Sequence, residues 1–441
     1  MIPARRPLGR IGVYAERDAS VPVAHVYVHL LVGCEADPPE AAGITRLAAR
    51  LMRAGTIARS REDLAREIES MGARLDVSVA HHRVTFSGHV LAGSLGPFLD
   101  LLEEVMLEPG NRPGDLDKIR RETVASLVAA RDDDQSLAYR HFRAALFPGH
   151  AYGRGAAGTP KSLAAPGRVD LVGHQEAVLR KARIALALAG DLDPDAAGPR
   201  LEGMLSRFSS CTLADPSTGD PAPPSGVRVR LVDKPARTQS QVYAGHLGCG
   251  AADPLYFPSV VACTALGGTF TARMSREIRQ ERGLSYGAYA RMLRSRHRDA
   301  FYMWTMPAIG DAAACVALEI GMLAARRDRG RGADEIEYAR EYLANHFLFA
   351  TETSAQRVNL AVREETLGLA PGFFDRYAAS VAAAGAEDVA AACGRCFDPA
   401  NMVVTALCTA DRVEPGMREA LGPGASIEVV PEEFQKTPTR K

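Results

Sequence analysis

The stretch SSCTLADPSTGDPAPPSG at residues 209–226 divides the chain into two halves of similar length. It holds four prolines and two glycines but almost no large apolar residue. Such a segment can neither bury surface nor sustain a strand ladder, so it predicts a semi-extended linker. The sequence therefore predicts a first domain over residues 8–208, a second domain over 227–432 and a frayed tail over 433–441.

The two halves share short motifs in the same order, about 210 to 220 residues apart. The matching pairs are residues 33–38 with 248–254, 66–68 with 276–278, and 184–188 with 402–407. One shared order at nearly one spacing predicts an ancient duplication, and two copies of this length are not a solenoid repeat.

Both halves mix strands with helices. Residues 25–30 alternate as a strand does, and the apolar residues between 44 and 52 form one helical stripe. The remaining predicted elements are a hairpin over 74–90 that turns near His81 and His82, and helices over 97–106, 115–131, 312–326 and 334–368. Hairpin strands and runs of helices predict an α+β fold of two homologous domains, each a mainly antiparallel sheet flanked by helices.

Composition narrows the function classes. The 441 residues hold 53 Lys and Arg against 53 Asp and Glu, and 46% are hydrophobic. Zero formal charge argues against a nucleic-acid partner, and the apolar content argues against general disorder. No run reaches the roughly 18 apolar residues of a membrane span, so none is expected.

Two further sequence features bear on the compartment. No apolar stretch follows the basic start MIPARRPLGR, so we expect no signal peptide; the protein would be cytoplasmic, or periplasmic if a leader has been removed. Eight cysteines are too few for a disulfide scaffold in a chain of this length. Cys393 and Cys396 form an isolated C-x-x-C, and we predict buried thiols there.

The run GITRLAARLMRAGT at residues 43–56 resembles the first active-site helix of the pitrilysin/insulinase metallopeptidases, the inverted zincins. In their motif His-x-x-Glu-His, two His on one helix face bind zinc and the Glu activates water. Here those three positions hold Arg46, Ala49 and Arg50. A guanidinium has no lone pair to give a metal, and alanine accepts no proton.

The family's third zinc ligand is also missing. It is a Glu about 76 residues after the second His, which corresponds here to Ser126. No His-x-x-Glu-His or His-Glu-x-x-His occurs in the chain. The resemblance therefore implies a member that binds no metal itself. Arg46 and Arg50 form either a solvated basic helix face or an electropositive wall for acidic peptide segments.

A second run, LGGTFTARMSREIRQERGLSYGAY at residues 266–289, reads as a glycine turn, a helix capped by Thr271 that stops at Gly283, and a strand. It is similar to the family's second signature. That resemblance implies that Arg279 and Tyr286 bind substrate and stabilise the transition state. It also implies substrate contacts at Gly267, Gly268 and Thr269. Without the resemblance, a strand Tyr beside a helix Arg is packing plus a solvated charge.

The resemblance implies that this chain is not catalytic alone. It would be the non-zinc subunit of a heterodimeric metallopeptidase, supplying Arg279 and Tyr286 to the zinc site of a homologous partner that carries His-x-x-Glu-His. This chain would need no cofactor, and the partner would hold the zinc. The alternative is a non-catalytic structural subunit of a larger complex, as in respiratory complexes. The peptide substrate is not indicated.

Overall fold

The computed structural model describes residues 2–8, 11–208, 219–329 and 332–433. The chain folds into two compact units. The first unit comprises residues 1–128, 154–218 and 348–376, and the second comprises 129–153, 219–347 and 377–441. Most of the predicted linker, at residues 209–218, and the tail from residue 434 lie outside the described residues.

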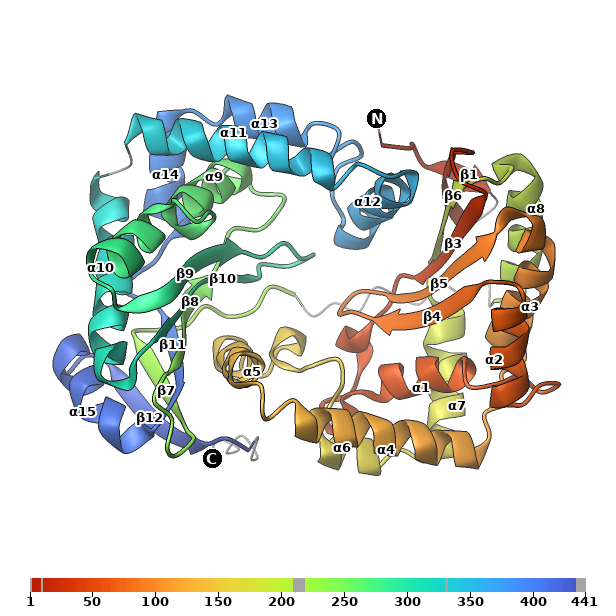
Figure 1. Cartoon of the computed structure of the whole chain (residues 1–441), viewed down its shortest axis with the longest axis horizontal. Helices are drawn as coiled ribbons and strands as arrows, with labels where there is room; N and C mark the ends of the chain where they lie inside the picture. Colours follow the sequence, from red (N-terminus) through yellow and green to blue (C-terminus); the bar gives the residue numbers. More distant parts are fainter. Residues whose placement is uncertain (1, 9–10, 209–218, 330–331, 434–441) are drawn as a thin grey trace. The chain divides into compact units, whose positions relative to one another are not determined.

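The first unit is built on a six-stranded sheet with the strand order β1-β2-β6-β3-β5-β4 (Figure 1). The strands are β1 Arg6–Leu8, β2 Ile11–Arg17, β3 Val23–Leu30, β4 Arg74–Val79, β5 Val84–Leu91 and β6 Ile184–Gly190. Neighbours are antiparallel except β2 and β6, which are parallel. The predicted hairpin is confirmed as β4 and β5, which turn at residues 80–83.

The second unit repeats this topology with the order β12-β7-β11-β8-β10-β9. The strands are β7 Arg228–Asp233, β8 Gln241–Leu247, β9 Ser285–Met292, β10 Ala300–Pro307, β11 Val403–Cys408 and β12 Ser426–Pro431. Here β7 is parallel to both β11 and β12, and the other pairs are antiparallel. The last five positions, from β2 to β4 and from β7 to β9, correspond strand for strand in the two sheets. The α+β fold and the duplication are therefore confirmed.

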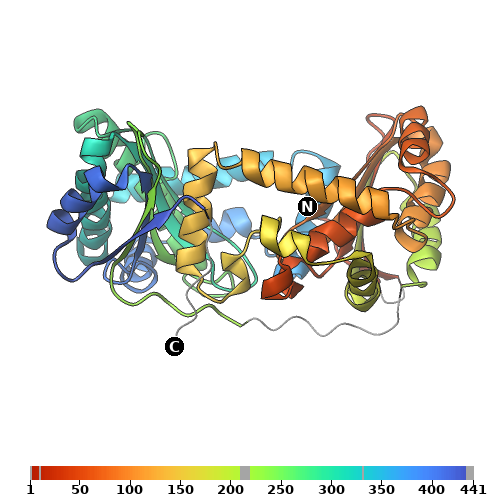
Figure 2. The same ribbon diagram turned by 90° about the horizontal axis from the view of Figure 1, so that it is seen from below.

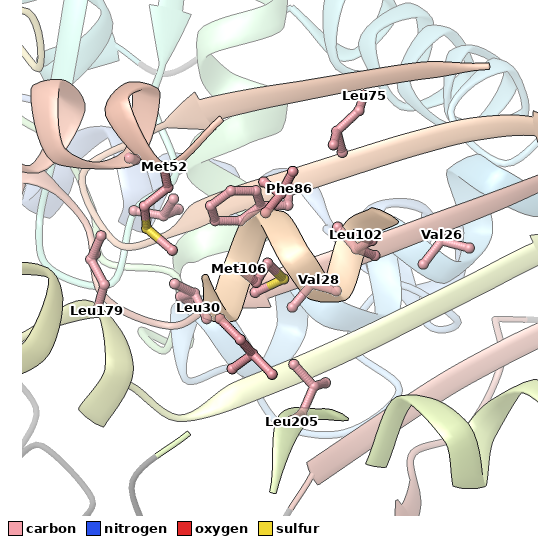
Figure 3. Close-up of a cluster of buried hydrophobic side chains, with 14 of the residues drawn as sticks. Val26, Val28, Leu30, Met52, Leu75, Phe86, Leu102, Met106, Leu179 and Leu205 are labelled. Atoms are coloured by element: carbon pink, nitrogen blue, oxygen red, sulfur yellow. The ribbon is translucent and has the colours of Figure 1, made fainter. Parts of the chain in front are cut away.

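Helices cover both faces of the first sheet. They are α1 Ile44–Met52, α2 Arg61–Ser70, α3 Leu95–Leu107, α4 Pro113–Ala129, α6 Pro160–Ala164, α7 Arg168–Ala177, α8 Pro194–Leu205 and α12 Ser354–Leu367. Figure 3 shows Val26, Val28 and Leu30 of β3 in one cluster with Leu102 and Met106 of α3. The alternating apolar residues that predicted this strand therefore lie on the face of β3 that packs in the core.

The second unit holds the helices α5 Asp134–Leu146, α9 Tyr256–Gly267, α10 Ala312–Arg329, α11 Ala333–Phe349, α13 Tyr377–Ala383, α14 Ala386–Cys396 and α15 Ala410–Leu421. The helix predicted over 334–368 is thus two helices, and this expectation was wrong. Thr353 caps α12 by accepting a hydrogen bond from the Gln356 amide, while the Gln356 side chain accepts from the Thr353 amide. This capping box starts a new helix and breaks the predicted one.

Each half of the sequence contributes one helix to the other unit. The helix α5 is encoded in the first half but packs on β8 and β11, and α12 is encoded in the second half but packs on β2 and β6. Phe142 of α5 lies in the core with Tyr243 and Val403, and Arg357 of α12 forms an ion pair with Glu16. The compact units thus differ at these segments from the sequence division at 208 and 227.

No helix within the described ranges has both the length and the apolar character needed to cross a membrane.

Candidate functional site

The helix α1 begins at a network around Asp37. The Asp37 carboxylate accepts hydrogen bonds from the Gly43 amide at 2.7 Å, the Thr45 amide at 3.2 Å and the Thr45 hydroxyl at 2.5 Å. Gly43 has φ +94°, a left-handed conformation that favours glycine. Burial raises the pKa of Asp37, although the hydrogen bonds from Thr45 and Gly43 oppose that shift. The Asp-Pro of the first half thus anchors the helix that carries the degenerate motif.

The three motif positions on α1 do not fit a zinc ion. Ala49 is fully buried in the apolar core and offers no donor atom. Arg46 is half-buried, and both burial and the charge of Arg50 lower the pKa of its guanidinium. A guanidinium that stays protonated repels a cation. Across the described part of the chain, no three His, Cys, Asp or Glu side chains are grouped so that they could hold a metal.

Arg50 binds α4 instead of a metal. Its Nη1 donates to the Thr123 hydroxyl at 2.7 Å, and its Nη2 donates to the Glu122 carboxylate at 2.8 Å. Both views of the ribbon show α1 beside α4 (Figures 1 and 2). Ser126, the position counted for the third ligand, is exposed on α4. The carboxylate that meets α1 belongs to Glu122, one turn earlier, and counting along the sequence missed it.

In the second unit, the glycine pair lies where α9 meets β9. Gly267 is the last residue of α9, and a Cβ there would come within 2.5 Å of the Ala290 amide nitrogen. A Cβ on Gly268 would come within 2.5 Å of the Thr264 Cα. Thr269 is buried, and its hydroxyl lies 3.4 Å from that of Thr271. Close packing of α9 on β9 accounts for Gly267, and the tight approach to Thr264 at the end of the same helix accounts for Gly268.

The segment after this pair is not the α-helix that was expected from Thr271. Residues Ser275–Glu281 form a seven-residue π-helix, η6, and Thr271 is not its N-cap. Glu335 of α11 holds the start of this segment through Arg273 at 3.0 Å and Arg276 at 2.9 Å. A π-helix widens each turn, and such segments occur often at functional sites. Gly283 ends the segment with φ +63°, as predicted.

Arg279 and Tyr286 come together, and a third residue joins them. The Arg279 guanidinium carbon lies 4.4 Å from the centre of the Phe270 ring and 4.6 Å from the centre of the Tyr286 ring. Both rings are open to solvent, at 59% exposed for Phe270 and 76% for Tyr286. We call these three residues the cation–aromatic stack. The sequence did not single out Phe270.

The polar groups of the cation–aromatic stack are not engaged by other side chains or by the backbone within the described residues. Within the described residues, neither the Tyr286 hydroxyl nor the Arg279 guanidinium makes a hydrogen bond or ion pair. Contact with two aromatic rings restricts the orientation of the guanidinium. Its N–H groups therefore point in defined directions while remaining free to donate hydrogen bonds. The arrangement can donate hydrogen bonds to an oxygen-rich ligand at low cost in side-chain entropy.

Two family models match consecutive stretches of the chain. Residues 12–160 match the family described as Insulinase (Peptidase family M16), and residues 168–323 match the Peptidase M16 inactive domain. An uncharacterized zinc protease of Mycobacterium leprae is 29% identical over 290 residues, which are 64% of this chain and 64% of that relative. The match thus spans less than two thirds of that relative's length.

Two further similarities concern proteins without peptidase activity in their description. A non-peptidase homolog of Helicobacter pylori is 22% identical over 367 residues, 82% of this chain and 84% of the relative. The fold is similar to the crystal structure of a peptidase M16 inactive domain from Pseudomonas fluorescens, with a TM-score of 0.83 and 20% identity, over 92% of this chain and 98% of that one. With consecutive matches through both halves and Arg46, Ala49 and Arg50 in place of the zinc motif, the chain belongs to the M16, or insulinase, peptidase family.

Proposed function

We propose that this chain is the non-zinc subunit of a heterodimeric M16 peptidase. In this proposal a homologous partner carries His-x-x-Glu-His and holds the zinc that polarises the scissile peptide. This chain contributes the cation–aromatic stack of its second unit. Substrate peptides bind in extended form by adding to a sheet edge. We place the chain in the cytoplasm, or in the periplasm if a leader is removed from a longer precursor.

The observation that carries the proposal is that Tyr286 is exposed and that, within the described residues, neither its hydroxyl nor the partly buried Arg279 guanidinium makes a hydrogen bond or ion pair. A scaffold protein has no need to hold an arginine between two solvent-exposed aromatic rings. In a peptidase, the Tyr286 hydroxyl donates a hydrogen bond to the oxyanion that develops on the attacked carbonyl. Arg279 donates charge-assisted hydrogen bonds to a neighbouring peptide carbonyl and so orients the substrate.

A second candidate function is a non-catalytic structural subunit of a larger complex. The observation that favours it is the ion pair between Arg50 and Glu122, which joins α1 and α4 with no metal. In that case the former catalytic helix serves stability alone. The two candidates differ in what they require of Tyr286, because a structural subunit needs no oxyanion donor.

The test is reconstitution with a homologous chain from the same organism that has an intact His-x-x-Glu-His. We expect neither chain alone to cleave a peptide library, and the mixture to cleave it. Tyr286→Phe should lower kcat of the mixture by about 10²-fold or more, as expected for the loss of an oxyanion donor. Its ring, and therefore its packing, is kept.

Tyr338→Phe is the matched control for this experiment. Tyr338 is also partly exposed, and its hydroxyl pairs with Thr271 at 3.2 Å. We expect its turnover to equal that of the unmodified chain. Equal turnover of the Tyr286→Phe mixture would remove Tyr286 from the chemistry and favour the structural candidate. One tightly bound zinc per purified chain, measured by elemental analysis, would contradict the division of labour.

A further inference from the structure

A cavity of about 210 Å³ lies beside the degenerate zinc motif in the first unit. Four elements form it: the end of α1, the start of α2, the edge strand β4 and the helix α4. Its lining residues are Arg50, Arg53, Ala54, Arg61, Asp76, Val77 and Ile119. Three guanidinium groups thus surround one small space, and we call it the arginine pocket.

The carboxylates of the arginine pocket do not balance its cations. Glu122 is shared between Arg50 at 2.8 Å and Arg61 at 3.6 Å. Asp76 pairs with the exposed Arg74 at 2.8 Å, outside the pocket lining. Arg53 donates its Nε to the backbone carbonyl of Leu75 and makes no carboxylate pair within the described residues. The pocket therefore retains positive charge.

Two further observations show that this charge is unsatisfied. The Nη1 of Arg61 is buried and has no hydrogen-bond partner among the described atoms. A buried donor without an acceptor is rare, because its lost hydration is not replaced. The pKa of Arg53 is lowered, first by burial and then by the charges of Arg61 and Arg50 against the opposing effect of Asp76. An anion in the pocket would relieve both the repulsion and the unpaired donor.

We propose that the arginine pocket binds a single carboxylate group of a peptide, either an acidic side chain or a free carboxyl terminus. The volume suits one such group with a few waters, since each water fills about 30 Å³ of liquid. Guanidinium groups match the planar carboxylate with paired hydrogen bonds. In the zinc-binding members of the family, the helix that corresponds to α1 binds a cation. In this chain, Arg50 of α1 lines a pocket that would bind an anion. The inference needs neither a partner chain nor zinc, so it stands or falls independently of the proposed function.

The experiment follows the arginine Nε–H signals of the full chain by NMR, with ¹⁵N-labelled arginine at low ionic strength. Three probes are titrated: N-acetylglutamate α-amide with a side-chain carboxylate, N-acetylglutamine with a terminal carboxylate, and neutral N-acetylglutamine amide. The Arg53→Gln and Arg61→Gln variants identify the two signals. We expect the Arg53 and Arg61 signals to move with one or both acids and to stay in place with the neutral amide. Which acid moves them identifies the source of the carboxylate.

Three variants sharpen the test. Arg61→Gln should weaken binding by about tenfold or more, as for loss of a charged hydrogen bond. Asp76→Asn should strengthen it several-fold, because it removes a negative charge from the pocket wall; a gain of affinity cannot result from misfolding. Arg66→Gln, an exposed change of the same kind on α2, should leave it unchanged. Equal shifts with the neutral amide, unmoved signals with both acids, or no gain for Asp76→Asn would overturn the proposal.

Discussion

The two motif regions of this duplicated chain differ in what their polar side chains contact. On α1 in the first unit, Arg50 is engaged with Glu122 and Thr123, and Ala49 is buried in the core. On η6 in the second unit, Arg279 lies between two exposed rings and donates to nothing within the described residues. In the first region, two positions of the degenerate zinc motif pack in the core or bind neighbouring side chains. In the other region, the polar groups have no hydrogen-bond or ion-pair partner within the described residues. The comparison teaches that, within one chain, the polar residues of one motif region can be bound into the fold while those of the other are not.

The largest predicted effect concerns Gly267. The family resemblance implies that this residue contacts substrate, whereas its close packing on β9 already explains the glycine. Gly267→Ala should lower the free energy of unfolding by about 3 kcal/mol, because the new Cβ would overlap the Ala290 backbone. Urea unfolding measures this change. Gly321→Ala on α10, where a Cβ meets no atom within 4 Å, is the control and should stabilise by about 1 kcal/mol. A Gly267→Ala protein of normal stability that binds peptide poorly would restore the binding role.

The next prediction concerns the pH dependence of stability, which should differ between the two units. Glu319 of α10 is fully buried, and burial raises its pKa to about 8 despite a hydrogen bond from the Thr305 hydroxyl at 2.8 Å. Its second oxygen has no partner in the described structure. The folded chain therefore keeps a proton that the unfolded chain loses above the ordinary glutamate pKa of 4.5. Stability should fall as pH rises from 4.5 towards 8 and then level off.

Glu319→Gln tests this pH dependence. The amide is neutral throughout, so the variant should lose this fall and be more stable than the unmodified chain at pH 8, by more than about 2 kcal/mol, since each pKa unit corresponds to about 1.4 kcal/mol. Urea unfolding at a series of pH values measures the difference. Parallel pH curves for the Glu319→Gln and unmodified chains would contradict the assignment.

In the first unit, burial lowers the pKa of His29 to about 3, which predicts loss of stability as pH falls below 6.5.

The smallest effect concerns the ion pair that replaces a metal bridge. Arg50 and Glu122 are 27% and 39% exposed, so water screens their attraction. A double-mutant cycle with Arg50→Met and Glu122→Gln should give a coupling energy of about 1 kcal/mol or less. Thermal unfolding of the four proteins measures it. A coupling of several kcal/mol would contradict this screening, and a coupling near zero would show that the ion pair adds nothing to the stability of α1.

Local patterns predicted the elements well. The alternation in β3, the stripe on α1 and the hairpin of β4 and β5 follow directly from periodicity, because one face of each is buried. Motif order indicated the duplication, and the two corresponding strand orders confirm it. The resemblance of residues 266–289 to the family's second signature, rather than spacing alone, identified Arg279 and Tyr286 as two members of the stack.

The misses have physical reasons. Phe270 carries no periodic signal, because an exposed ring at a turn packs on a neighbour that only the fold supplies. The π-helix η6 has no local code that distinguishes it from an α-helix. Glu122 was missed because counting to Ser126 assumed a fixed register between α1 and α4. The exchange of α5 and α12 is invisible locally, since an amphipathic stripe shows that a helix packs but not against which sheet.

That reciprocal exchange of helices makes each half of the chain depend on the other. A fragment ending near residue 208 would lack α12 and its bonds from Tyr14 to Glu365 and from Arg357 to Glu16. The complementary fragment would lack α5 and the aromatic contacts of Phe142. A chain cut once in the segment between the halves would keep both helices in their places. The two pieces of such a nicked protein would therefore stay associated after cleavage, and neither would persist on its own.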